Sequence, residues 1–254
     1  MIKSLKKALN ILTLLSKNQG KSVSLKTMSE ELGINKSTCA HLVKTLEEEG
    51  YVTKISASKG YVLGPAAYCL SEGGRYKKDL VAICRPVIDY LYKSLGHCVA
   101  LSILENGKKY IIDYIDDGTI FKEKKAIMRD DIYRTATGRV LLMNLPDEDI
   151  VEIYEKFGAP AEGDWDEVKS ADDIIRIKRN IAVGSVVETR KVYEKVALGY
   201  ALPIFDLTGC VGAVGVAVYI SLEEEKKFAE EEKIIKSFLK KGANEIMRRL
   251  KNGM

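Results

Sequence analysis

The sequence predicts an α+β protein in two parts: three helices and a hairpin at the N-terminal end, then a larger part built on an antiparallel sheet. Two capped amphipathic helices and two short alternating runs follow one another between residues 22 and 64. Gly64-Pro65 then breaks the chain. Beyond the break, helices and pairs of strands alternate without the strand-helix-strand regularity of a parallel sheet.

A first helix is expected from about Ile2 to Ser16, because apolar residues recur there at helical spacing. One side of this helix should complete a three-helix core with the two helices that follow. The residues expected on that side are Leu5, Ala8, Leu9, Leu12 and Leu15.

The next two helices carry their own start and stop signals. Ser24 is the expected N-cap of a helix that ends at Gly33, and Asn35 is the expected N-cap of a helix over 36–49 that Gly50 stops. Two alternating runs, 51–55 and 60–64, then surround a polar tip and predict a hairpin. The apolar stripe of the second helix consists of Cys39, Leu42, Val43 and Leu46.

Helix, turn, helix and hairpin in this order describe a winged helix-turn-helix, so we expect this part to bind DNA. The opposite face of the second helix has small and hydrogen-bonding side chains that fit a major groove, which makes it the expected recognition helix. Residues 1–64 contain ten lysines and five glutamates, a charge of +5, whereas the whole chain carries +4. The expected DNA-binding residues are Lys26, Lys36, Ser37, Thr38, Ala40, His41, Lys44, Lys54 and Lys59.

Length and composition leave room for a second compact domain. The chain has 254 residues, of which 46% are hydrophobic. Its five cysteines are scattered without CxxC spacing, so we expect neither a disulfide framework nor a metal site, and no cofactor. No apolar run reaches the ~18 residues of a membrane span, and the chain start is amphipathic rather than a signal peptide, so we expect a cytoplasmic protein.

The second part should begin with a helix over 79–95 that Gly96 closes. A hairpin across Asn106-Gly107 should follow, because this dipeptide is a strong turn signal. The expected elements are strands over 97–105 and 109–116, strand segments within 119–128, helices over 138–144, 147–157 and 171–180, strands over 196–205 and 210–220, and a single helix over 222–250. We expect a DNA-binding domain over 1–64, a linker helix over 65–78 and a sheet domain over 79–254.

Three segments resemble the IclR (isocitrate lyase regulator) family of bacterial transcription regulators. They are the recognition helix with its wing, residues 36–52 and 61–64; the small-residue loop and helix from Thr135 to Leu142; and the late hairpin around Ala201 to Asp206 with Gly209. The resemblance covers nearly the whole chain. It implies a GAF-like effector-binding domain, a homodimer or dimer of dimers (a homotetramer), and ligand-dependent control of an operon for a small carbon compound, as repressor or activator.

Two departures from the family pattern limit what the resemblance implies. Ala40-His41 stands where the family commonly has a His-Arg pair, so a guanidinium that could read guanine is missing and the operator should differ. His41 could donate to a base or phosphate, or it could simply be exposed. Glycine or alanine stands at 199, 215 and 217, where the family often has a cysteine and serines. From this we expect fewer hydroxyls, more volume and a bulkier or more apolar ligand, such as an aromatic or branched acid.

The loop before the helix at 138 is the expected anion site of the effector domain. Thr135 and Thr137 have hydroxyls, and the N–H groups that begin a helix favour a carboxylate. The alternative is that these threonines only cap the helix. The expected effector-binding residues are Met128, Thr135, Ala136, Thr137, Gly138, Gly199, Ala201, Gly215 and Ala217.

Other function classes have weaker support in the sequence. The chain has two histidines, His41 and His97, and no phosphate-binding glycine motif, so an enzyme is not expected. His97 and Cys98 are adjacent, but neighbouring side chains on a strand point to opposite faces. A ligand-independent architectural or interaction protein remains as an alternative, and it would have an effector domain filled by its own side chains.

Overall fold

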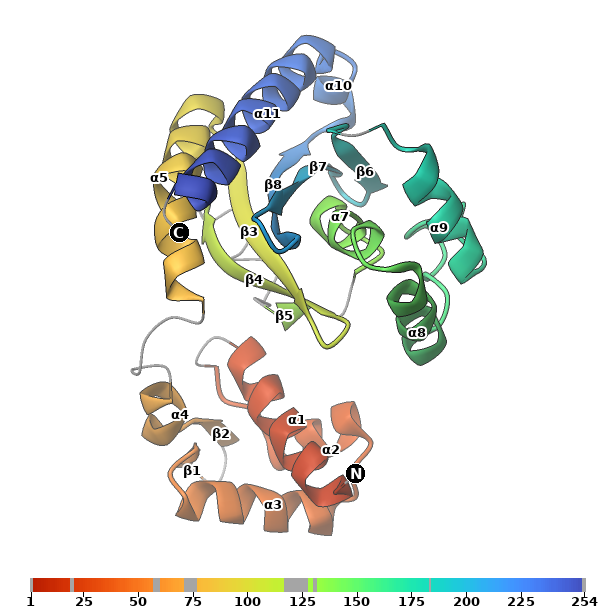
Figure 1. The fold of residues 1–254 in the computed structure, drawn as a ribbon. Helices are drawn as coiled ribbons and strands as arrows, with labels where there is room; N and C mark the ends of the chain where they lie inside the picture. The colour runs from red at the N-terminus through yellow and green to blue at the C-terminus, as the bar shows by residue number, and fades with distance from the viewer. Residues whose placement is uncertain are drawn as a thin grey trace. The chain divides into compact units, whose positions relative to one another are not determined.

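The computed structural model describes residues 2–18, 21–56, 60–70, 77–116, 128–129, 132–182 and 184–252. The chain divides into two compact units, residues 1–76 and 77–254 (Figure 1). Within the described helices, none combines the length and apolar character needed to cross a membrane.

The first unit has the elements of a winged helix-turn-helix. Helix α1 spans Lys3–Lys17, α2 Leu25–Leu32 and α3 Lys36–Glu48, and strands β1 (Val52–Ser56) and β2 (Gly60–Leu63) form an antiparallel hairpin. The Ser24 side chain accepts a hydrogen bond from Thr27 N, and the Asn35 side chain accepts one from Thr38 N. Both caps satisfy N–H groups that have no partner within their helices. The predicted elements of this unit are therefore confirmed.

Two close backbone approaches fix the wing against the rest of this unit. Tyr61 pairs with Val23 in an isolated antiparallel bridge. A Cβ at Gly60 would lie 2.5 Å from Val23 O, and Gly60 has a φ of 90°. Only glycine meets both conditions, so the start of β2 is set by this residue.

The prediction for the core side of α1 was partly wrong: Leu15 is buried and Leu12 packs against the core, as predicted, but Leu5 and Leu9 do not. Leu5 and Leu9 are each 54% exposed, whereas Ile11, Leu14 and Leu15 are buried. These three pack with the buried residues of α2, α3 and the wing, including Met28 and Val43. Apolar residues recur at helical spacing on two sides of α1. The sequence pattern alone therefore does not show which side packs on the core.

The connector was predicted as a helix over 65–78. Helix α4 spans Pro65–Cys69, and residues 71–76 lie outside the described residues. The linker helix and the predicted domain boundaries therefore stay predictions.

The second unit is built on one antiparallel sheet of six described strands in the order β5-β4-β3-β8-β7-β6. Strands β3 (Cys98–Glu105) and β4 (Lys108–Ile115) form the predicted hairpin, and both Asn106 and Gly107 have positive φ, as a type I′ turn requires. Strands β7 (Val196–Phe205) and β8 (Cys210–Ile220) match their predicted bounds. Of the predicted strand segments within 119–128, residues 119–127 lie outside the described residues, and β5 is Met128–Arg129.

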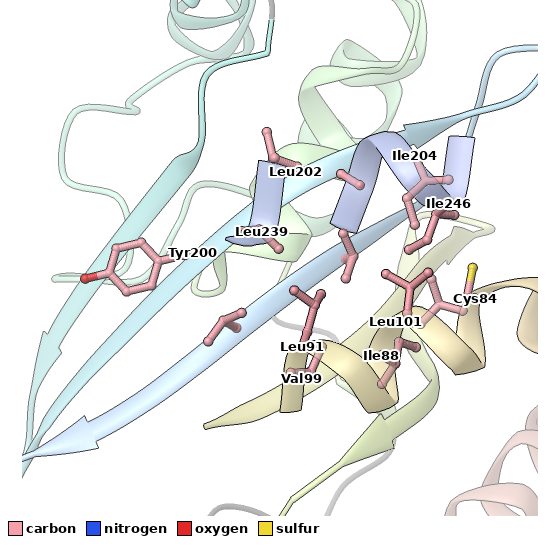
Figure 2. Packing of buried hydrophobic residues seen from close by; sticks show 14 of the residues in the cluster. Cys84, Ile88, Leu91, Val99, Leu101, Tyr200, Leu202, Ile204, Leu239 and Ile246 are labelled. Carbon is pink, nitrogen blue, oxygen red and sulfur yellow. The ribbon is translucent and has the colours of Figure 1, made fainter. Parts of the chain in front are cut away.

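Two long helices cover one face of this sheet (Figures 1 and 2). Helix α5 spans Lys78–Leu95 and α11 spans Ala229–Asn252. Their buried side chains pack on alternate residues of β3, β7 and β8, such as Leu101 and Leu202. Gly242 of α11 lies against Leu91 of α5, where a Cβ would be 2.9 Å from Leu91 Cδ1, so glycine permits the close helix packing.

Helix α7 (Ala136–Met143) packs on the opposite face of the sheet, against the small buried residues Ala201 and Ala213. Helices α8 (Asp147–Phe157) and α9 (Ala171–Asn180) follow it, both at their predicted bounds. The first turn of α7 therefore ends over the middle of the sheet, which positions the site described below.

Two features of this unit differ from the prediction. Strand β6 (Val187–Val192) was not predicted, because both of its faces carry polar residues and it lies at the sheet edge. The single C-terminal helix is two helices, α10 (Leu222–Glu225) and α11. Between them Phe228 is buried in the core, and its N–H bonds to Glu225 O, a tighter turn than an α-helix makes.

Candidate functional site

The residues predicted to bind DNA lie on the first unit. Lys36, Ser37, His41 and Lys44 are exposed on α3, while Thr38 and Ala40 are half-buried. Lys26 is exposed on α2 and Lys54 on β1, and Lys59 lies outside the described residues. Lys44 Nζ is 3.7 Å from Glu48 Oε1 on the same helix, but both side chains are more than 60% exposed, so this pair is weak and Lys44 can exchange it for phosphate.

A cavity of about 130 Å³ in the second unit lies between the first turn of α7 and the sheet. Its floor is made of the small residues of four neighbouring strands, because Cys98, Ala100 and Ser102 on β3 face it together with residues of β4, β7 and β8. Of the predicted effector-binding residues, it is lined by Thr135, Ala136, Thr137, Gly199, Gly215 and Ala217.

Three predicted effector-binding residues are elsewhere. Gly138 faces backbone, since a Cβ there would clash with Ile132 O. Ala201 has no exposed surface and packs in the core under α7. Met128 lies in β5, and the structure describes its backbone only. Gly138 and Ala201 therefore support the cavity wall rather than line it, and these two assignments are corrected.

The prediction of fewer hydroxyls than the family pattern has stays a prediction, but other residues bring hydroxyls to the cavity. A Cβ at Gly199 would lie 2.5 Å from Thr189 Oγ1, and one at Gly215 would lie 2.5 Å from Thr137 Cγ2. Threonines from β6 and α7 thus occupy space that the two glycines leave. The hydroxyl-bearing residues that line the cavity are Ser102, Thr135, Thr137, Thr189, Tyr193 and Tyr219.

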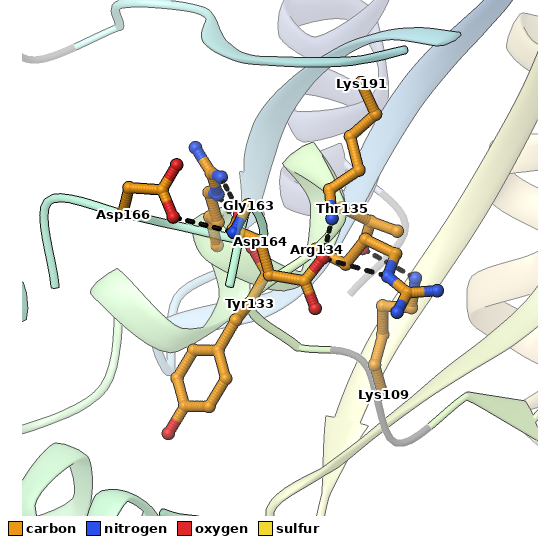
Figure 3. A network of polar contacts seen from close by, with 9 residues as sticks. Lys109, Tyr133, Arg134, Thr135, Gly163, Asp164, Asp166 and Lys191 are labelled. Atoms are coloured by element: carbon orange, nitrogen blue, oxygen red, sulfur yellow. Dashed lines mark hydrogen bonds and ion pairs between the residues drawn. The ribbon is translucent and has the colours of Figure 1, made fainter. Parts of the chain in front are cut away.

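Lys109 and Thr135 form the polar end of the cavity (Figure 3). Lys109 is 2% exposed, and its Nζ donates to Thr135 Oγ1 over 2.7 Å. Thr135 is the N-cap of α7, and its Oγ1 also accepts from Gly138 N over 3.2 Å. With both lone pairs of this hydroxyl used, its own hydrogen is left to donate to an acceptor.

Two further cations, Arg134 and Lys191, line the cavity on the side of β6. Both pair with Oδ1 of Asp164, Arg134 through Nε at 3.1 Å and Lys191 through Nζ. Sequence analysis missed Lys109, Arg134 and Lys191. The lysines lie on strands 82 residues apart in sequence, and only the sheet order brings them to one cavity.

Arg139 holds the segment that carries Asp164 against α7. Its Nε donates to Tyr133 O over 2.8 Å, one of its terminal nitrogens donates to Asp164 O, and its guanidinium lies 4.6 Å from the centre of the Trp165 ring. Burial lowers the pKa of Arg139 to about 10, with Glu167 and Asp166 opposing the shift. The group remains charged at neutral pH.

Another cavity, of about 500 Å³, lies beside β6 and the start of α11. Its lining contains the carboxylates of Asp164, Asp166, Glu167, Glu188, Glu225 and Glu232 and the guanidinium groups of Arg139 and Arg190. An organic acid would meet an excess of like charge there, so the smaller cavity under α7 is the candidate acid site.

His97 and Cys98 do not form a catalytic dyad. His97 Nε2 is 2.7 Å from Glu231 Oε1, whereas Cys98 lines the cavity on the other face of the sheet. Although the two residues are adjacent in sequence, their side chains lie on opposite faces of the sheet.

Comparison with known proteins identifies the fold and its family. The IclR helix-turn-helix domain matches residues 4–56, and the C-terminal domain of bacterial IclR transcriptional regulators matches residues 76–248. The chain belongs to the IclR family. Its members are transcription regulators that bind DNA through the helix-turn-helix, not enzymes.

Individual relatives of this IclR-family chain are distant. The acetate operon repressor of Salmonella typhimurium is 22% identical over 163 residues, which span 63% of this chain and 59% of that repressor. A glycerol operon regulatory protein of Streptomyces coelicolor is 29% identical over 85% of this chain and 84% of its own. A crystal structure of an IclR homologue from Microbacterium hydrocarbonoxydans complexed with 4-hydroxybenzoate has a TM-score of 0.69 and 16% identity, covering 98% of this chain and 99% of that one.

Proposed function

We propose that this IclR-family protein is a ligand-responsive transcription regulator, a repressor or activator, that binds operator DNA through α3 and senses a small organic acid in the cavity under α7. The observation that carries the proposal is the contact between Lys109 and Thr135 at the start of α7. It joins a buried cation, a hydroxyl with a hydrogen to donate and a helix N-terminus at one end of a cavity. This is the chemistry that holds a carboxylate.

The backbone at this end supports the same ligand. The N–H groups of Ala136 and Thr137 are in the first turn of α7, where no carbonyl of the helix can accept from them. Both residues line the cavity. A carboxylate beside them would accept from N–H groups, from the Thr135 hydroxyl and from Lys109, and such charge-assisted bonds are roughly twice as strong as neutral ones.

The rest of the cavity favours a compact apolar body. Ile111, Leu198 and Val216 line it together with the alanines and glycines of the sheet. Its volume of about 130 Å³ is close to the ~150 Å³ of an engineered protein cavity that binds benzene. We therefore propose an aromatic or branched acid, a class to which the 4-hydroxybenzoate of the Microbacterium homologue belongs. A ligand-independent protein with a filled effector domain is disfavoured by this cavity.

On the DNA side, the exposed residues of α3 suit a major groove. Lys36 and Lys44 would contact phosphate, which fixes the position of the helix, whereas His41 would face the bases. A change of sequence preference in His41→Ala would support that role. Two recognition helices would read half-sites about one helical turn, or a multiple of it, apart.

Such recognition needs at least a homodimer, and α1 offers a surface for it. Ile2, Leu5 and Leu9 are all more than 50% exposed and recur at helical spacing, so they form one apolar stripe. Burial of this stripe against a second copy would remove apolar surface from water. Pairing of dimers into tetramers is compatible with the same arrangement.

Ligand binding would act on DNA through the connector between the two units. To shift occupancy, the acid must bind one arrangement of the paired DNA-binding units better than another. A coupling free energy of about 1–3 kcal/mol would change DNA affinity roughly 5- to 150-fold. The site of action would be the bacterial cytoplasm, where the operator is.

The proposal is tested by binding of the purified protein to DNA from upstream of its own gene, measured over a range of salt and repeated with a panel of aromatic and branched acids. Specific binding that one acid shifts would support the proposal. Specific binding that no acid of the panel shifts would contradict the proposed effector class, and the absence of specific binding would contradict DNA regulation itself.

A further inference from the structure

Ser102 places a buried hydroxyl in the floor of the cavity under α7. The residue has no exposed surface, and its Oγ has no hydrogen-bond partner among the residues that the structure describes. It nevertheless lines the cavity. Buried hydroxyls are usually hydrogen-bonded, because an unsatisfied one has lost its bonds to water without replacement. This hydroxyl is therefore a polar group that a bound ligand could satisfy.

The neighbours of Ser102 on this face of the sheet are apolar. Ser102 pairs with Ile111 of β4 and with Ala213 of β8, while Ala100 and Leu104 flank it two residues away on β3. Residues directly opposite on a neighbouring strand, or two apart on the same strand, share one face of a sheet. None of these four side chains can donate or accept a hydrogen bond. The Ser102 hydroxyl therefore depends on what the cavity holds.

The register of the sheet puts Ser102 close to the proposed carboxylate position. Lys109 and Gly215 lie two residues beyond the partners of Ser102 on β4 and β8, in opposite directions, so Ser102 is between them on the cavity face. The start of α7 covers the same part of the floor. There Lys109 Nζ donates to Thr135 Oγ1, and Gly215 faces Thr137 Cγ2. A carboxylate at the start of α7 would therefore have Ser102 near the atoms beside it.

Building on the function proposed above, we propose that the effector is a hydroxy acid whose hydroxyl is beside its carboxylate, and that Ser102 is the specificity-determining residue that binds this hydroxyl. A serine hydroxyl both donates and accepts, which suits a ligand hydroxyl. An acid of the same shape without the hydroxyl leaves Ser102 unsatisfied in the complex and binds less tightly.

The test measures affinities of the full-length protein by calorimetry for two comparisons. The first is isovalerate with 2-hydroxyisovalerate, which differ by one hydroxyl beside the carboxylate. The wild type should bind the hydroxy acid about tenfold more tightly, the change expected for one hydrogen bond to an otherwise unsatisfied group. The second is 2-hydroxybenzoate with 4-hydroxybenzoate, whose hydroxyl is across the ring from its carboxylate. The wild type should prefer 2-hydroxybenzoate, and failure of either comparison would overturn the inference.

Ser102→Ala shows whether this serine causes the preference. The variant should fold, because it removes a hydroxyl that has no partner in the described part of the chain. Its affinity for 2-hydroxyisovalerate should fall to that for isovalerate, which should be unchanged. Ser94→Ala, at an exposed serine of α5, is the matched control and should keep the wild-type ratio. A wild-type ratio in Ser102→Ala would overturn the inference. An equal loss for both acids would also overturn it, because Ser102 would then bind the carboxylate itself.

The outcomes separate this inference from the function on which it rests. If none of the four acids binds the wild type, the proposed acid sensing fails and this inference fails with it. If isovalerate binds and its hydroxylated partner gains nothing, acid sensing stands and only the hydroxy-acid class is wrong. Both comparisons in the wild type need no variant, so they decide the inference even where Ser102→Ala does not fold.

Discussion

Lys109 Nζ lies 2.7 Å from Thr135 Oγ1, which joins a buried lysine of β4 to the N-cap of α7. The contact leaves the threonine hydroxyl as a donor, because its oxygen also accepts from Gly138 N. It therefore turns what would be an ordinary helix cap into the polar end of a cavity. The sequence allowed two hypotheses for Thr135, a helix cap and a ligand-binding residue. In this geometry one threonine can serve as both.

The close packing of α7 on the sheet indicates a substitution that should block the cavity. Gly215→Ala would place a methyl group 2.5 Å from Thr137 Cγ2, so either this side chain shifts or the cavity is blocked. We expect Gly215→Ala to weaken acid binding by at least tenfold. The double variant Gly215→Ala/Thr137→Ser, which removes the opposing methyl group, should recover most of it. Calorimetry with a monocarboxylic acid measures both, and no recovery would mean that the methyl contact is not the cause.

From the buried Ser102 hydroxyl we predict that the ligand carries a second polar group. Ser102 has no exposed surface, lines the cavity, and its Oγ has no hydrogen-bond partner in the part of the chain that the structure describes. An unsatisfied buried hydroxyl costs about 1–3 kcal/mol. Ser102→Ala should therefore raise the melting temperature of the ligand-free protein and abolish any preference for hydroxylated over unsubstituted acids. A lowered melting temperature together with an unchanged preference would show that Ser102 is satisfied without ligand.

For DNA binding, Lys44→Ala should weaken affinity for all sequences alike. Affinity falls as the salt concentration rises, and each lost phosphate contact makes this fall less steep. We expect the magnitude of the slope of log affinity against log salt to decrease by about one per recognition helix. Lys240→Ala, at an exposed lysine on α11 of the other unit, is the charge-matched control. Fluorescence anisotropy over a salt series measures both variants. Equal slopes for Lys44→Ala and the wild type would remove Lys44 from the interface.

Burial of thiols predicts how stability depends on alkaline pH. Burial, assisted by Asp113, raises the pKa of Cys84 from 9.0 to about 12. Because the folded state keeps this proton longer than the unfolded state, its contribution to stability is complete below pH 9 and is lost as the pH rises toward 12. Denaturant unfolding at a series of pH values should show that decline. In native protein at pH 8, Cys84 should resist alkylation while the exposed Cys69 reacts, and equal labelling of the two would contradict the burial.

The sequence was a good guide wherever local chemistry decides an element. Ser24, Asn35 and Asn106-Gly107 fix caps and a turn by their own hydrogen bonds and dihedral preferences, and the structure has each of them in place. Strand β6 was not predicted because both of its faces carry polar residues, so the run shows no alternation of apolar and polar side chains. Its signal would have been the β-branched residues of the run rather than its hydropathy.

The candidate site was only half predictable for a different reason. The residues of the 135–138 loop are neighbours in sequence, so the helix start could be recognised directly. Lys109 on β4 and Lys191 on β6 reach the same cavity only through the order of the sheet, in which β3, β8 and β7 lie between their strands. The room expected from Gly199 and Gly215 is taken up by Thr189 and Thr137, which depends on which residues face one another across the fold.

We propose that an acid held at Lys109 and Thr135 changes DNA affinity. The most direct measurement is anisotropy of labelled DNA from upstream of the gene, with and without a monocarboxylic acid that binds the protein, for the wild type and for Lys109→Met. We expect a roughly 5- to 150-fold shift in the wild type and full DNA binding without a shift in Lys109→Met. An equal shift in both proteins would contradict this proposal.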